Sequence, residues 1–242
     1  GYILGRDLSQ SLKYQLKRTE IRNVDETAST LIKEQEGTNT VSQISQTTVF
    51  DKRDNRYEPK DGYVVSLTNE LAGLSGDTQH FRTRIKTGYF VSLFEDKVLA
   101  FTAESGHIIG IDQDVNIGER FFLGGQTVRG FSNSGIGPRD GITNDALGGN
   151  NYYAGSIELR FPLGLGEELG INGSLFTDVG SLWSLDRDTS DILDSSGTRA
   201  SAGFGLSWAT GLGLMRVDFA SALLKEDWDE TEFVRFSFGT RF

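Results

Sequence analysis

Apolar and polar residues alternate strictly along much of the chain. In residues 198–209, the even positions beginning with Ala200 are all apolar, whereas the odd positions beginning with Arg199 are small or polar. A period of two residues places successive side chains on opposite faces of an extended strand. The alternation therefore predicts β-strands with one apolar face.

The same alternation predicts ten strands. Most of them contain 12–16 residues. That length exceeds the roughly 5–6 residues usual in soluble proteins and covers the about 9–11 residues with which a tilted strand crosses a bilayer. The predicted strands are residues 8–22, 38–51, 61–74, 78–93, 97–111, 150–162, 169–184, 198–210, 213–224 and 231–242.

The connections and the aromatic residues favour a sheet whose apolar face contacts lipid. The long connections 23–37, 112–149 and 185–197 fall at one end, and shorter ones fall at the other, apart from the brief link 75–77. Aromatic residues on the apolar face gather near the two ends, as in outer-membrane barrels. We therefore predict an all-β, antiparallel transmembrane β-barrel and prefer it to a large soluble β-sandwich, which also alternates. The aromatic residues are Phe50, Tyr63, Phe161, Trp208 and Phe242 at the short-turn end and Tyr153 and Trp183 at the other.

Composition agrees with such a fold. The 242 residues suffice for one β domain, and 30 Gly with 3 Pro suit many strands joined by tight turns. Apolar residues make up 37%, with no run of the roughly 18 residues that a transmembrane helix needs. No signal peptide is recognisable after Gly1. The absence of Cys excludes disulfides and thiolate chemistry, and the net charge of −10 disfavours nucleic acid as a partner.

Two internal segments resemble motifs of the BamA family. FFLGGQTVRGFSNSGIGPRD (121–140) is similar to the family's lid loop, and VFDKRDNRYEPKDGYVVSL (49–67) is similar to its periplasmic turn. In the lid loop the central residues are Val128, Arg129, Gly130 and Phe131. In the turn the matching residues are Asp51, Arg53, Asp54 and Asn55.

Two further segments extend the resemblance over nearly the whole chain in the right order. FTDVGSLW (176–183) is similar to a strand that follows the lid loop, and the C-terminal FSFGTRF resembles the signal by which outer-membrane barrels are recognised for assembly. The alternating aromatic residues of that signal are Phe236, Phe238 and Phe242.

The resemblance implies a sixteen-stranded barrel whose lid loop joins the eleventh and twelfth strands. Here five strands precede the loop 112–149 and five follow it. Residues 1–242 would thus be a partial barrel domain of about ten strands, without the first six strands and without the periplasmic POTRA domains. Because barrel diameter grows with strand number, ten strands of a wider wall should form an open sheet. We therefore expect no pairing between strands 8–22 and 231–242.

Arg129 is the leading candidate for a functional residue. The resemblance implies that the lid loop folds back into the lumen, where its Arg binds acidic groups on the wall. Independently, the strand phases turn Glu158 and Asp178 toward the lumen, because Ile157 and Val179 face lipid. A guanidinium has five donors and can hold two carboxylates at once. The contrasting interpretation is a solvated loop residue.

Other charged residues suggest structural roles. Arg82, Arg84 and Lys86 face inward beside Glu70 and Glu104, and we interpret them as cross-strand pairs in a wet lumen rather than as an anion path. His80 and His107 lack metal-ligand spacing, so we expect no metal site. We also expect no cofactor and no enzymatic activity, because no catalytic constellation stands out.

The resemblance implies a factor that folds and inserts β-barrel proteins into the bacterial outer membrane by offering a sheet edge, without nucleotide. Its expected partners are unfolded outer-membrane barrel substrates, accessory assembly lipoproteins, POTRA domains, the lipid bilayer and lipopolysaccharide. Long loops would be extracellular, and short turns periplasmic. The alternatives are a related translocation pore, of the two-partner secretion or autotransporter-assembly type, and a passive porin.

Overall fold

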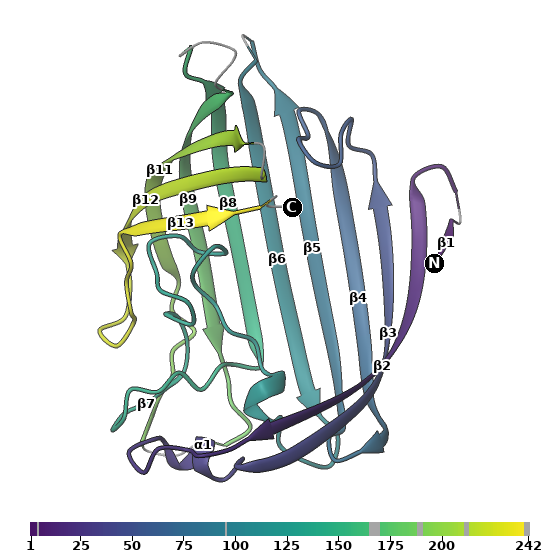
Figure 1. The fold of residues 1–242 in the computed structure, drawn as a ribbon, viewed down its shortest axis with the longest axis vertical. Helices are drawn as coiled ribbons and strands as arrows, with labels where there is room; N and C mark the ends of the chain where they lie inside the picture. Colours follow the sequence, from purple (N-terminus) through teal and green to yellow (C-terminus); the bar gives the residue numbers. More distant parts are fainter. Residues whose placement is uncertain (4, 95, 165–169, 188–190, 211–212, 240–242) are drawn as a thin grey trace.

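The computed structural model describes residues 1–3, 5–94, 96–164, 170–187, 191–210 and 213–239. Its main feature is a single antiparallel sheet in the order β1-β2-β3-β4-β5-β6-β8-β9-β11-β12-β13, which is strongly curved and has the connection 112–149 on its concave side (Figure 1). The strands of this sheet are β1 (Tyr2–Ile3), β2 (Leu8–Ile21), β3 (Gly37–Asp51), β4 (Gly62–Gly76), β5 (His80–Ser92), β6 (Val98–Gly110), β8 (Asn151–Pro162), β9 (Ile171–Trp183), β11 (Arg199–Thr210), β12 (Gly213–Leu224) and β13 (Val234–Phe238).

The sheet is open. β1 and β13 stand at its two ends and do not pair with each other. The strands between them follow one another in chain order, apart from the short strands β7 and β10, which form a separate two-stranded sheet. This confirms the expectation that strands 8–22 and 231–242 do not close a small barrel. A wall curved for a larger circumference cannot bring these two edges together.

The two faces of the sheet differ in the way the alternation predicts. Large apolar side chains such as Phe81, Tyr89 and Leu175 are exposed on the outer face. The inner face buries charged residues, among them Glu158 and Asp178. Aromatic pairs lie at both ends of the outer face. Phe50 and Tyr63 form a tilted pair, and Tyr153 and Trp183 form an edge-on pair, with ring centroids 5.8 and 5.9 Å apart.

The long connection 112–149 fills the hollow of the sheet. Its residues Leu123, Val128 and Phe131 form an apolar cluster with Tyr152 and Leu182 of the inner wall. The loop contains the 3₁₀ turn η1 (Ile117–Glu119) and the short strand β7 (Arg139–Asp140), which pairs with β10 (Ile192–Leu193). Because its apolar side chains are buried against the wall, the loop is part of the folded core rather than a mobile flap.

Several details differ from the sequence prediction. The short strands β1, β7 and β10 and the single-turn helix α1 (Thr30–Lys33) were not predicted, because elements of two to four residues carry almost no periodic signal. The predicted last strand, 231–242, was wrong at its start. β13 begins at Val234, and Thr231 instead forms a bridge with Phe131 of the lid loop. Within the described residues, no helix is long and apolar enough to span a membrane.

Candidate functional site

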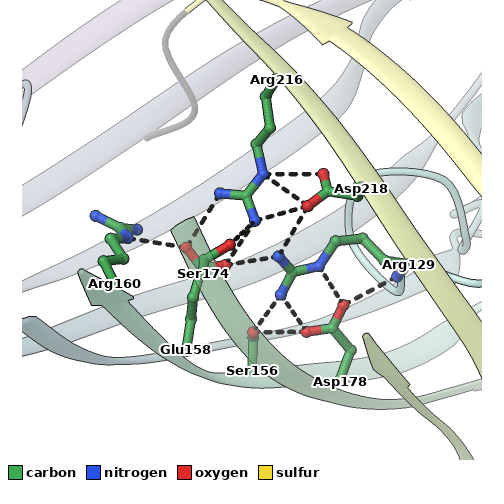
Figure 2. A network of polar contacts seen from close by, with 8 residues as sticks. All are labelled: Arg129, Ser156, Glu158, Arg160, Ser174, Asp178, Arg216 and Asp218. Atoms are coloured by element: carbon green, nitrogen blue, oxygen red, sulfur yellow. Dashed lines mark hydrogen bonds and ion pairs between the residues drawn. The ribbon is translucent and has the colours of Figure 1, made fainter. Parts of the chain in front are cut away.

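The guanidinium of Arg129 lies at the centre of a buried charge network on the inner wall (Figure 2). Its Nε and Nη2 donate to the two carboxylate oxygens of Asp178 at 2.7 and 2.6 Å, and its Nη1 donates to Glu158 at 2.6 Å. Nη2 also donates to Ser156 at 3.0 Å. Arg129 therefore contacts both acids that the strand phases turned inward. We call these contacts of Arg129 with Glu158 and Asp178 the lid-loop lock.

The guanidinium of Arg129 also stacks on an aromatic ring. The Cζ atom of Arg129 lies 3.2 Å from the ring centroid of Phe176. Phe176 belongs to the same inward-facing row of β9 as Asp178, two residues away. A guanidinium over an aromatic face gains electrostatic and dispersion energy, more so when both are removed from water. Arg129 is 1% exposed, so this gain adds to that of the charged hydrogen bonds.

Two further arginines complete the network. Arg216 of β12 donates to Glu158 at 3.1 and 3.0 Å and to Asp218 at 2.8 Å, and Arg160 donates to Glu158 at 2.9 Å. Three guanidinium groups thus face the three carboxylates of Glu158, Asp178 and Asp218 (Figure 2). The charges balance, which is what buried ionised groups require if they are to be stable.

The backbone conformation around Arg129 explains how the Arg129 side chain reaches the inner wall from a loop. Val128 and Phe131, which flank the pair Arg129-Gly130, are 0% exposed and anchor the motif in the apolar cluster. Gly130 has φ +90°, a left-handed conformation that glycine adopts at no steric cost. A Cβ atom there would also lie 3.2 Å from the Cβ of Ser201 on the wall. The four motif residues therefore pack as one unit, with the guanidinium of Arg129 reaching the inner wall.

The residues of the turn motif hold the β3–β4 turn together. Arg53 donates through Nε and Nη2 to the carboxylate of Asp51 at 2.9 and 3.0 Å. Asp54 accepts from the backbone N–H groups of Lys60 and Asp61 at 3.0 and 3.1 Å, and Asn55 accepts from two further backbone N–H groups. Asp54 is exposed, and although some loss of hydration acts to raise its pKa, these backbone hydrogen bonds outweigh that effect and lower the pKa below its usual value.

Two of the other inward cations, Arg82 and Lys86, pair with acids on neighbouring strands, whereas Arg84 lies over the ring of Phe121, 5.5 Å from its centroid. Arg82 bonds Glu70 at 2.8 Å and also Glu119 of η1 at 3.1 Å, and Lys86 bonds Glu104 at 2.7 Å. The interpretation as cross-strand charge pairing is therefore confirmed for these residues. Among the described residues, no group of three or more His, Asp or Glu side chains is placed to hold a metal ion.

The C-terminal motif lies on the outer face where the structure describes it. Phe236 and Phe238 are 76% and 61% exposed. Phe242, the third aromatic residue of the motif, lies outside the described residues. These two phenylalanines face outward and do not contact the residues of the lid-loop lock, so the site and the C-terminal motif are separate features.

Arg216 and Asp218 were not predicted as site residues from the sequence. Both alternate with the apolar Met215, Val217 and Phe219, so their inward orientation was readable. The contact of Arg216 with Glu158, however, joins residues 58 positions apart, on strands that are separated in the sheet by β9 and β11. A buried ion pair between Arg199 and Asp229, 2.9 Å apart, was missed for the same reason.

Comparisons with known proteins agree with this fold. The model of the Omp85 superfamily domain matches residues 1–242. The chain is 39% identical over 238 residues to outer membrane protein assembly factor BamA of Neorickettsia risticii, covering 98% of this chain and 32% of that protein. It is 36% identical over 171 residues to a sorting and assembly machinery component 50 homolog of Xenopus tropicalis, covering 69% of this chain and 36% of that protein.

A solved structure shares the architecture. The crystal structure of BamA from Haemophilus ducreyi lacking POTRA domains 1–3 superposes with a TM-score of 0.81 at 20% identity, over 96% of this chain and 51% of that chain. This likeness establishes the fold as that of a BamA barrel wall. The chain spans about a third of the length of the curated relatives that it matches.

Proposed function

The chain belongs to the Omp85 superfamily, and from this membership we propose that it is the barrel wall of a factor that folds and inserts β-barrel proteins into the bacterial outer membrane. Its relatives include an outer membrane protein assembly factor BamA and a sorting and assembly machinery component 50 homolog. The substrates are unfolded outer-membrane barrel proteins, and the partners include accessory lipoproteins and POTRA domains. The long loops face the outside of the cell and lipopolysaccharide, and the short turns face the periplasm.

The buried position of Arg129 carries this proposal. A loop whose Arg is 1% exposed and bonded to two wall carboxylates fills the lumen rather than leaving it open. Leaving one member of such a buried network unpaired is strongly unfavourable. A plugged lumen suits a protein that acts at its sheet edge and its lipid-facing wall. It does not suit a passive porin, which needs an open lumen.

The mechanism follows from the physical chemistry of sheet edges. An edge strand presents unpaired N–H and C=O groups, which lipid cannot satisfy but a second strand can. A substrate segment that pairs with the edge gains backbone hydrogen bonds, and its apolar side chains leave water for lipid. The lid-loop lock keeps the wall rigid while this exchange takes place. The chemistry requires no nucleotide.

Replacing the central arginine tests the proposal. In the protein as its host cell produces it, we expect Arg129→Ala to lower the amounts of folded outer-membrane barrels more than it lowers the amount of the protein itself. Arg187→Ala is the matched control, because Arg187 also forms two ion pairs at 2.7 Å but is about half exposed. Equal losses of the protein and of the barrels in Arg129→Ala would contradict the proposal.

Conductance separates the proposal from a passive pore. The purified protein in a planar bilayer should conduct weakly and intermittently, because the lid loop fills the lumen. A large and steady conductance that Arg129→Ala does not increase would favour the porin.

A further inference from the structure

Near its start, the lid loop carries a buried acid in addition to Arg129. Glu119 of η1 is 6% exposed. Its Oε1 accepts a hydrogen bond from Nζ of Lys17 on β2 at 3.2 Å, and its Oε2 accepts one from Nη2 of Arg82 on β5 at 3.1 Å. We call these contacts of Glu119 with Lys17 and Arg82 the second lock.

The second lock joins strands that are not neighbours. β2 and β5 are separated in the sheet by β3 and β4, so in a flat sheet they would lie roughly 14 Å apart. A single carboxylate bonds to both strands because the wall is curved and Glu119 lies on its concave side. Arg82 also bonds Glu70 of β4 at 2.8 Å, which fixes the orientation of its guanidinium.

The residues around Glu119 contact the same part of the wall. Nδ2 of Asn116 donates to Oγ1 of Thr78, in the link between β4 and β5, at 3.0 Å. The ring of Phe121 is 6% exposed and lies beside the guanidinium groups of Arg82 and Arg84, whose Cζ atoms are 5.7 and 5.5 Å from its centroid. Such contacts between a cation and an aromatic face are favourable away from water. The start of the lid loop is therefore fixed to the strands that precede it.

The two locks have opposite charges and lie on different halves of the wall. The lid-loop lock places a cation beside acids of β8 and β9, whereas the second lock places an acid beside cations of β2 and β5. Exchanging their places would bring Arg129 beside two cations and Glu119 beside two acids, which is costly in a buried site. The charges thus favour one orientation of the loop across the concave side of the sheet (Figure 1).

We propose that Glu119 is a positioning residue that fixes the start of the lid loop to β2 and β5, so that the seated loop braces the two halves of the wall and sets their separation. Neighbouring strands can change their mutual twist, so the pairing of strands does not by itself fix the curvature of a sheet. A loop that is bonded to distant strands at two points restricts that change. The inference concerns the shape of the wall and goes beyond the proposed function.

Electron paramagnetic resonance can measure the separation of the two halves. Residues 1–242 contain no Cys, so Leu16→Cys on β2 and Leu175→Cys on β9 can carry spin labels once any Cys elsewhere in the protein is changed to Ser. Both leucines are exposed, 62% and 53%, on the outer face, so the labels do not contact the lid loop. The whole protein, as its host cell produces it, is measured in detergent, and gel mobility confirms that each variant is folded.

The labelled parent should give one narrow distribution of distances. Glu119→Gln keeps the shape of the side chain but removes its charge. We expect the ratio of molecules outside the parent's distance range to molecules within it to rise about tenfold, which corresponds to roughly 1.4 kcal/mol.

Glu104→Gln is the matched control. Glu104 bonds Lys86 at 2.7 Å on the same wall, but that ion pair joins β6 to β5 without the lid loop. The control should therefore leave the ratio unchanged. No rise in Glu119→Gln, or an equal rise in Glu104→Gln, would overturn the inference.

Variants of Lys17 separate the effect of charge from that of packing. The Lys17 side chain is 44% exposed, so its replacement should not prevent folding. Lys17→Met removes the contact with β2 alone, and we expect the ratio to rise about threefold. Lys17→Arg keeps the cation and should give the narrow distribution of the parent. Equal rises in Lys17→Met and Lys17→Arg would contradict the role of the ion pair, as would a further threefold rise when Lys17→Met is added to Glu119→Gln.

Discussion

The lid-loop lock predicts unequal energetic coupling between Arg129 and its two acids. Glu158 keeps two other cations when Arg129 is removed, since Arg216 bonds it at 3.0 Å and Arg160 at 2.9 Å. Asp178 keeps the hydroxyl of Ser156 at 2.6 Å and the backbone N–H of residue 129 at 3.0 Å, but Arg129 is the cation that bonds it. Asp178 is 0% exposed, so water cannot replace the lost charge.

The magnitudes follow from these contacts. Breaking a buried ion pair on one side typically costs about 3–5 kcal/mol. In a double-mutant cycle of Arg129→Met with Asp178→Asn, we expect a coupling energy of about 3 kcal/mol, near the upper end for residues in contact. In the cycle of Arg129→Met with Glu158→Gln, we expect about 1 kcal/mol, because Arg216 continues to neutralise Glu158.

Urea unfolding in detergent measures both cycles, with the gel mobility of the folded barrel as the readout. The exposed pair Arg187 and Asp114, 2.7 Å apart, serves as the control and should show a coupling energy under about 1 kcal/mol. Equal coupling energies for the two acids, or a larger one for Glu158, would refute the assignment of Asp178 as the acid that depends on Arg129.

Three further outcomes follow from the geometry. Gly130→Ala should destabilise the folded protein by about 1–3 kcal/mol in the same unfolding assay, because the residue has φ +90° and an added Cβ would lie 3.2 Å from Ser201. Asp54→Asn should lower the unfolding midpoint by the equivalent of about 1 kcal/mol, because the weaker amide acceptor faces two backbone N–H groups; an unchanged midpoint would contradict this. An impermeant thiol reagent on intact cells should label Asn144→Cys but not Lys60→Cys, and the reverse result would invert the proposed orientation.

The sequence determined the features that depend on local geometry. A period of two residues is a property of each strand alone, so the ten long strands and their faces were readable without tertiary information. The inward orientation of Glu158 and Asp178 followed from the same period. To predict their contact with Arg129, only the resemblance of residues 128–131 to a known lid-loop motif was needed in addition. The prediction that the sheet stays open followed from the count of ten strands together with the resemblance to a family of sixteen-stranded barrels.

The tertiary structure alone decided which distant groups meet. Strand phase places Arg216 on the inner face, but it cannot say that curvature of the wall brings Arg216 within 3.0 Å of Glu158. Likewise, the sequence analysis extended the last strand back to residue 231, yet residues 230–232 form backbone hydrogen bonds with lid-loop residues 130–135. Backbone donors and acceptors form hydrogen bonds with whichever partner groups the fold places beside them. Since that neighbour comes from about a hundred residues earlier in the chain, no local pattern in the sequence specifies it.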